Sequence, residues 1–136
     1  MPFKPTHILD ANAVIAYLKN EPGADVVAEL IANPEHRLAI HAVNATEVYY
    51  NYLRSDGQAV ADAAWQSMTA FATVVTTMED QFLKRVGRWV MDYNPGLADS
   101  FGAATAEEFG IPLVSADHKD FDDAVVAGAL QVVWIR

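Results

Sequence analysis

The sequence contains no cysteine and few basic residues. Without thiols, disulfides are excluded, and any bound metal would have to be held by oxygen or imidazole groups. Nine Lys and Arg residues are outnumbered by 18 Asp and Glu residues, so the formal net charge is -9. This balance argues against a broad basic face for nucleic acid, because that kind of affinity comes from neutralising phosphates. A polyanionic substrate would need another source of positive charge, such as divalent cations bound by carboxylates.

Long hydrophobic runs are also absent. The few apolar residues between Lys4 and Asp10 do not form a secretory signal, and no later run approaches the length of a membrane span. At the same time, 52% of the 136 residues are hydrophobic, which is enough to fill the core of one ordinary domain. We therefore expect a single domain over residues 1–136, in a soluble cytoplasmic protein that is not attached to a membrane.

The chain does contain an alternation of short apolar runs with helical patterns. The runs are typical of buried strands and lie at residues 8–9, 38–40, 73–76, 113–115 and 132–135. Apolar residues spaced by three or four predict helices between these runs, including residues 11–18, 24–32, 79–92 and 97–109. The alternation predicts a three-layer α/β/α fold with a central, mostly parallel sheet of about five strands.

Acidic residues recur where the strands end or the helices begin. Asp10 directly follows the first strand, and Asp117 lies just after the fourth. Ligand sites of parallel α/β sheets lie at the carboxyl ends of strands, so both carboxylates are candidates for a functional site. Glu47 lies in the first turn of a helix that Asn44 is predicted to cap. The alternatives are local roles, since Asp10 would also serve as a helix cap and Glu47 would complete a capping box.

Asp99 lies in the helix with the most informative pattern. It shares a face with Gly102, Ala103 and Ala106, whose small side chains allow a close approach to a neighbouring element. That face directs the carboxylate inward rather than to solvent. Four carboxylates are therefore expected to converge on one edge of the sheet: Asp10, Glu47, Asp99 and Asp117.

Such a cluster repels itself and raises its own pKa values unless cations neutralise it. Hard divalent ions that prefer oxygen ligands, Mg²⁺ or Mn²⁺, meet this requirement. One or two such ions can activate water and offset charge on a phosphodiester, without a Ser, Cys or His nucleophile. The pattern thus indicates metal-dependent phosphodiester hydrolysis, which reconciles an acidic protein with an acidic polymer as substrate.

Four short motifs carry the carboxylates and their neighbours: Ile8-Leu9-Asp10-Ala11-Asn12, Asn44-Ala45-Thr46-Glu47-Val48, Leu97-Ala98-Asp99-Ser100 and Ser115-Ala116-Asp117-His118-Lys119-Asp120-Phe121. Across essentially the whole chain, they resemble PIN-domain ribonucleases, most closely the VapC-type toxins of bacterial toxin-antitoxin pairs. The resemblance implies a PIN-like fold and an endoribonuclease that hydrolyses RNA with metal-activated water, using one or two Mg²⁺ or Mn²⁺ ions. The catalytic, metal-holding positions that it implies are Asp10, Glu47, Asp99 and Asp117.

The resemblance also implies supporting residues and partners. Ser115 matches a hydroxyl residue that supports the site, and Asn12 stands where the family more often has Ser or Thr. Family members are usually homodimers and are held inactive by a small antitoxin whose tail crosses the active site. The net charge of -9 would favour a basic partner. The partner would bind in a groove formed by apolar residues of two helices: Val26, Val27, Leu30, Ile31, Tyr49, Tyr50 and Tyr52. The alternative role of these residues is burial in the core.

Several other polar residues have two interpretations each. Lys84, Arg85 and Arg88 form the only cluster of basic residues and are either a solvated helix face or contacts to RNA phosphate. His118 is either a solvated residue or a contact to metal or RNA. Asp120 either adds a fifth carboxylate or caps a short helix that follows it.

Two other functions compete with the nuclease. A phosphatase of the aspartyl-phosphate kind also places Asp after its first strand, but such enzymes need a second Asp two residues later, where this chain has Asn12. A non-catalytic PIN-like binding module would keep the fold without the chemistry. The presence of all four acidic positions argues against that alternative.

Overall fold

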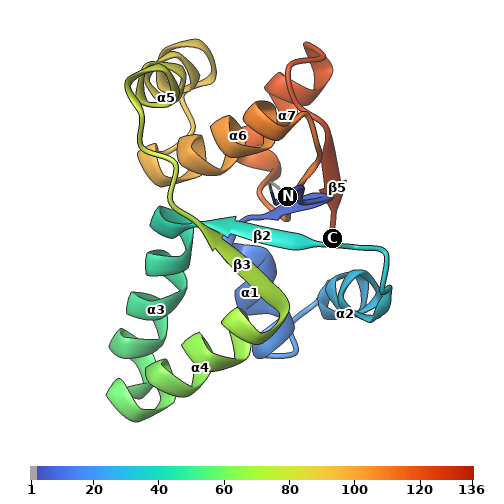
Figure 1. The fold of residues 1–136 in the computed structure, drawn as a ribbon, viewed down its shortest axis with the longest axis vertical. Coiled ribbons are helices and arrows are strands. Elements are labelled where there is room, and N and C mark those ends of the chain that lie inside the picture. The colour runs from blue at the N-terminus through green and yellow to red at the C-terminus, as the bar shows by residue number, and fades with distance from the viewer. Residues whose placement is uncertain (1–2) are drawn as a thin grey trace.

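The computed structural model describes residues 3–136 and is built around one parallel sheet (Figure 1). Its strands are β1 (His7–Leu9), β2 (Leu38–His41), β3 (Ala72–Val75), β4 (Leu113–Ser115) and β5 (Val132–Trp134). They lie in the order β3-β2-β1-β4-β5, and every neighbouring pair is parallel. The predicted sheet of about five strands is therefore confirmed, and it is wholly rather than mostly parallel.

Helices cover both faces of the sheet. One layer contains α1 (Ala11–Leu18), α2 (Ala24–Ala32), α3 (Ala42–Asp56) and α4 (Gln58–Phe71). The other contains α5 (Asp80–Tyr93), α6 (Leu97–Phe109) and α7 (His118–Val126). In the view of Figure 1, α3 and α4 lie below the strands and α5, α6 and α7 above them, which confirms the three-layer architecture. No helix within residues 3–136 combines the length and the apolar character needed to cross a membrane.

Two hydrophobic cores, one on each face, hold the layers together. Side chains alternate between the faces along a strand. Leu9 therefore packs in the core of the α1–α4 layer, while its neighbour Ile8 packs in the core of the α5–α7 layer. Leu113 and Val114 of β4 are divided in the same way, and all four residues are fully buried. Burial of each such side chain contributes about 1.5–3 kcal/mol, so the central strands form a rigid base for whatever lies at their ends.

The topology creates a switch point at the carboxyl end of β1. The chain crosses from β1 to β2 on one side and later returns through β4 on the other side. In open parallel sheets, ligands bind in the crevice outside the strand ends at such a point. Asp10 directly follows β1, α3 directly follows β2, and Asp117 lies just after β4. Three of the four acidic motifs therefore meet at the switch point.

The predicted cap of α3 is wrong. The N-cap is His41, whose Nδ1 accepts the Val43 N–H at 3.0 Å, and the helix begins at Ala42. His41 takes this unusual role because Nε2, on the other side of its ring, bonds to the Thr77 carbonyl at 2.9 Å and fixes the ring. The earlier start places Asn44 inside the helix, where it is fully buried.

The start of α7 excludes one of the two roles considered for Asp120. The N-cap is Asp117, whose carboxylate accepts the Asp120 N–H at 3.1 Å. Asp120 therefore lies within the first turn and does not cap the helix.

The last strand, β5, is only partly buried, because it forms an edge of the sheet.

Candidate metal centre

Asp10 is held at the end of β1 with only 1% of its surface exposed. Its Oδ1 accepts the Ala11 N–H at 2.8 Å and so caps α1. Its Oδ2 accepts the Ser115 hydroxyl at 2.8 Å and the Asn12 amide at 3.1 Å. Asp10 therefore combines the two roles considered for it, because it caps a helix and also presents a carboxylate at the switch point.

Asn12 and Ser115 join the ends of β1 and β4. The Asn12 amide also donates to Ser115 Oγ at 3.3 Å, and Asn12 Oδ1 accepts the Ala116 N–H at 3.0 Å. Ser115 Oγ in turn accepts the Asp117 N–H at 3.0 Å. These bonds fix the loop after β4 against Asp10. Both ends of the Asn12 amide are therefore used, the nitrogen toward Asp10 and Ser115 and the oxygen toward Ala116.

Glu47 and Asp99 come from α3 and α6, which pack against each other. Asn44 Nδ2 donates to Glu47 Oε1 at 3.0 Å and to the Ala98 carbonyl at 2.9 Å, so it links the two helices beside the carboxylates. The capping-box role of Glu47 is wrong, because α3 begins at Ala42 with His41 as its N-cap, so Asn44 does not cap the helix. The small residues expected to let α6 approach a neighbour are all buried: Gly102, Ala103 and Ala106.

The carboxylates form two overlapping groups. One carboxylate oxygen from each of Asp10, Glu47 and Asp99 lies within 4.8 Å of the other two, and we call these residues the inner group. Asp99, Asp117 and Asp120 meet the same criterion and form the outer group. The structure thus brings together all four predicted carboxylates and adds Asp120 as a fifth.

Burial and mutual repulsion weaken the acidity of the inner group. Burial raises the pKa of Asp10 to about 7, although the hydrogen bond from Ser115 favours the ionised form. Burial likewise raises the pKa of Asp99 to about 10, and its hydrogen bond to Asp120 adds to the rise. The pKa of Glu47 is raised by burial and lowered in part by the hydrogen bond from Asn44. Without a cation, the group therefore retains a proton on Asp99 at neutral pH.

The outer group has a different balance. The hydrogen bond from Asp99 holds the pKa of Asp120 below its ordinary value, despite some burial. Burial raises the pKa of Asp117, and the backbone N–H of Asp120 opposes that rise. Asp99 is thus the protonated partner in this hydrogen bond, and Asp120 is the ionised one.

These donors fit a hard divalent cation. They are all carboxylate oxygens, which Mg²⁺ and Mn²⁺ prefer, and they come from strand ends and helix turns that the fold fixes independently. A cation would take the place of the proton on Asp99 and offset the repulsion that raises these pKa values. The inner group would hold one ion, and Asp117 and Asp120 would be available for a second.

His118 is the first residue of α7 and takes part in neither group. Its Nδ1 is 2.9 Å from Asp122 Oδ1, and its Nε2 is 3.0 Å from the Arg136 carbonyl oxygen. Its ring stacks on Trp134 with 3.7 Å between centroids. These contacts connect the start of α7 to the end of β5 and to Arg136, and a contact between His118 and RNA stays a prediction.

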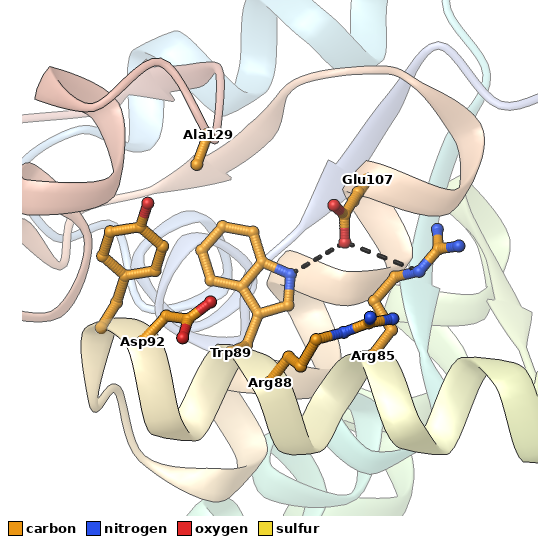
Figure 2. Close-up of a pocket in the computed structure, with 7 residues that line it drawn as sticks. Arg85, Arg88, Trp89, Asp92, Glu107 and Ala129 are labelled. Atoms are coloured by element: carbon orange, nitrogen blue, oxygen red, sulfur yellow. Dashed lines mark hydrogen bonds and ion pairs between the residues drawn. The ribbon is translucent and has the colours of Figure 1, made fainter.

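The basic cluster of α5 lies outside the carboxylate groups. Arg85 is paired with α6, its Nη1 lying 3.1 Å from Glu108 and its Nε 3.7 Å from Glu107. Figure 2 shows Arg85 and Arg88 beside Trp89, whose Nε1 donates to Glu107 at 3.1 Å. The other two basic residues of the cluster are exposed. Arg85 therefore has a structural partner, and the binding of RNA phosphate by the cluster stays a prediction.

The apolar residues considered for a partner groove divide between core and surface. Val27 and Tyr52 are buried in the core of the α1–α4 layer, as the alternative interpretation holds. Tyr50 is 42% exposed. The remaining residues are partly buried against that core: Val26, Leu30, Ile31 and Tyr49. A groove on these helices would therefore use only part of the predicted surface.

Sequence reasoning missed the position of Asn44. It assigned this residue to the helix cap, whereas the side chain bonds to Glu47 and to α6. The spacing contained a usable signal, because residues three apart lie on the same face of a helix. An amide three residues before a candidate carboxylate is therefore a candidate partner of it.

Comparison with known families identifies the protein as a PIN domain. The model of the PIN domain family matches residues 7–126, so the chain belongs to this family. No curated protein sequence gives a significant match.

Solved structures share the fold at low sequence identity. A toxin-antitoxin complex from Klebsiella pneumoniae is 21% identical, with a TM-score of 0.71 and coverage of 96% of this chain and 98% of that one. VapBC-1 from nontypeable Haemophilus influenzae is 21% identical, with a TM-score of 0.72 and coverage of 95% and 97%. VapC20 of Mycobacterium tuberculosis, described as a sarcin-ricin loop cleaving toxin, is 14% identical, with a TM-score of 0.69 and coverage of 87% and 94%.

Proposed function

We propose that the protein is an endoribonuclease that depends on Mg²⁺ or Mn²⁺ and hydrolyses phosphodiester bonds of RNA. The observation that carries this proposal is the inner group, in which three carboxylates from three separate elements converge at the switch point of the sheet. Membership of the PIN domain family supports the same class of activity.

Hydrogen bonds within the chain orient Asp10 for binding a cation. Asp10 is fixed in one orientation by three hydrogen-bond donors, from Ala11, Asn12 and Ser115. A divalent cation, when bound, supplies Lewis-acid chemistry, because it lowers the pKa of water and offsets charge on the phosphodiester. Without the cation, the carboxylates would repel the RNA backbone. The approach of RNA and its hydrolysis therefore both depend on the carboxylates that hold the cation.

The phosphatase alternative has less support. In that class, the residue two positions after the nucleophilic Asp must be free to act as an acid. Here that residue is Asn12, and its side chain bonds to Asp10, Ser115 and the backbone of Ala116. Its place in the structure is that of a positioning residue rather than a proton donor.

We further propose that this ribonuclease is the toxin of a toxin-antitoxin pair in the cytoplasm and that it forms a homodimer. The structures from Klebsiella pneumoniae and Haemophilus influenzae, which are a toxin-antitoxin complex and VapBC-1, share its fold over nearly the whole chain. A cluster of carboxylates is also a receptor for a cationic side chain, and a net charge of -9 would speed the encounter with a basic antitoxin.

Cleavage of RNA by the purified protein tests the nuclease proposal. We expect cleavage in Mg²⁺ or Mn²⁺, none in EDTA, and none by an Asp10→Asn variant that remains folded. Hydrolysis of a phosphomonoester without cleavage of RNA would favour the phosphatase instead. Binding of RNA without any hydrolysis would favour the non-catalytic module.

Expression with and without the neighbouring reading frame tests the toxin proposal separately. Growth arrest that requires Asp10 and is relieved by the neighbour would support it. Harmless expression of an active enzyme, with a monomeric mass and no co-purifying partner, would leave a housekeeping nuclease.

A further inference from the structure

A fully buried asparagine lies between the carboxylates of α3 and α6. Asn44 Nδ2 donates to Glu47 Oε1 at 3.0 Å and to the Ala98 carbonyl at 2.9 Å. Ala98 immediately precedes Asp99 in the first turn of α6. One amide group is thus bonded both to a carboxylate of the inner group and to the backbone beside another.

The opposite end of the same amide faces α6 without a partner. Asn44 Oδ1 is a buried acceptor that receives no hydrogen bond from the described residues. Leaving such an atom unpaired costs free energy, so fold stability alone does not account for an amide here. The two hydrogen bonds from Nδ2 do account for the amide. Nδ2 can donate to both Glu47 and Ala98 only when the amide lies in this orientation, which leaves Oδ1 unpaired.

Gly102 leaves room on α6 for the side chain of Asn44. A Cβ added at Gly102 would lie 3.3 Å from Asn44 Oδ1, closer than ordinary van der Waals contact. A larger residue would push Asn44 away or shift α6, and either movement would change the hydrogen bonds to Glu47 and Ala98. The small-residue face of α6 therefore has a specific use at this position.

We propose that Asn44 is a positioning residue that sets the placement of Glu47 relative to Asp99, and that Gly102 is the contact that keeps Asn44 in place. The inference rests on the proposed function, because it concerns how the inner group is arranged to hold a cation. It assigns Asn44 no contact with metal or RNA. Its effect passes through Glu47 and through the first turn of α6.

Four variants of the full chain separate this role from a general effect on folding. Asn44→Ala removes both hydrogen bonds, whereas Gly102→Ala keeps every polar group and only displaces Asn44. The double variant combines them. Gly87→Ala is the matched control, because it makes the same change in α5, where a Cβ would meet nothing within 4 Å.

The main readout is Mn²⁺ affinity, measured by calorimetry and by the spectrum of bound Mn²⁺ in electron paramagnetic resonance. Each single variant should bind Mn²⁺ at least about tenfold more weakly, as is typical when a residue that supports metal ligands is lost. In RNA cleavage, kcat should fall while KM for RNA stays unchanged. Gly87→Ala should match wild type in both assays, and circular dichroism should confirm that each variant is folded.

The double variant tests whether Gly102 acts through Asn44. Once the side chain of Asn44 is removed, the added Cβ has nothing to displace, so the double variant should bind Mn²⁺ as Asn44→Ala does. Two independent losses that add together would overturn the proposed link. If Asn44→Ala does not fold, Gly102→Ala against Gly87→Ala still decides the question.

Mn²⁺ affinities within about twofold of wild type in both single variants would overturn the inference, since such a change is far below the usual cost of losing a supporting residue. Failure of the proposed function gives a different pattern. If wild type binds Mn²⁺ but cleaves no RNA, the nuclease proposal fails, while weaker Mn²⁺ binding by Asn44→Ala still supports the positioning role.

Discussion

The inner and outer carboxylate groups share Asp99 but are held in different ways. In the inner group, Asp10 is nearly inaccessible and accepts three hydrogen bonds, and Glu47 is bonded to a buried amide. In the outer group, Asp117 and Asp120 both come from the start of α7, and both are partly exposed. The inner group therefore depends on the packing of three elements, whereas the outer group adds one helix end to it.

The difference shows which part of the site the fold preorganises. Burial raises the pKa of Asp10 and of Asp99, so the ionised form of the inner group is unfavourable when no cation is bound. Asp120 stays ionised, because its neighbour Asp99 donates a hydrogen bond to it. We therefore expect substitutions in the inner group to have the larger effect on activity and those in the outer group to have graded effects.

The largest effect is expected for the residue that both groups share. Asp99→Asn should reduce RNA cleavage by more than roughly 100-fold, above what is usual for residues that only support metal ligands. It should also raise the melting temperature in EDTA, because wild type must take up a proton at Asp99 on folding and an amide needs none. Single-turnover cleavage and thermal unfolding of the same preparation measure both. Full Mg²⁺-dependent activity of this variant would remove the inner group from the mechanism.

A comparison across the two groups should give the next largest difference. Glu47→Gln keeps the size of the side chain but removes its charge, and it should reduce cleavage by about 10- to 100-fold or more. Asp120→Asn should cost less than about tenfold, because Asp120 joins the inner group only through Asp99. The two rates should be measured at saturating Mg²⁺. Equal losses in the two variants would mean that the groups act as a single unit.

Stability without metal should depend on pH in a way that identifies the inner group. Asp99 has an ordinary pKa of 3.8 and a pKa of about 10 in the folded protein. The folded state thus binds the extra proton between these values, and the free energy of unfolding falls as pH rises toward 10. In EDTA, the urea midpoint should fall between about pH 7 and about pH 9. A fall of the same size in Asp99→Asn would contradict the assignment.

The placement of the carboxylates could be predicted from the sequence, and so could Asn12 and Ser115 as residues beside them. The bonds of Asn44 and the cap at His41 could not. Asp10 and Asp117 lie just after short apolar runs, and parallel strands bring such positions together whatever the details of packing. The bond from Asn44 to Ala98 joins residues 54 positions apart and depends on how closely α6 packs on α3. Capping by His41 likewise depends on a contact with Thr77, which no local pattern indicates.

Asp117 offers a smaller effect that separates two roles of one residue. It caps α7 through its bond to the Asp120 N–H, and Asn is as good a cap as Asp. Asp117→Asn should therefore lose activity with little change in stability, whereas Asp117→Ala should in addition lose about 1 kcal/mol of stability. Urea unfolding of both variants in EDTA measures the difference. Equal stability of the two would show that the cap contributes nothing.

The smallest effect is expected outside both groups, at the basic residues of α5. Changing Lys84, Arg85 and Arg88 should weaken RNA binding modestly and equally for different sequences, as contacts to phosphate do. The slope of log affinity against log salt should decrease by about 1 for each side chain that contacts phosphate. Arg85→Ala alone should also lower stability slightly, since it loses its pairs with α6. An unchanged slope in the triple variant would leave these residues as a solvated face.

The central claim is that the inner group holds a divalent cation. The most direct test is the anomalous difference map of a crystal grown with Mn²⁺ and measured where manganese scatters anomalously. The account predicts a peak in contact with the carboxylates of Asp10, Glu47 and Asp99, and no such peak in Asp99→Asn crystals. A wild-type map with no peak between these three carboxylates, at an Mn²⁺ concentration that supports cleavage, would contradict it.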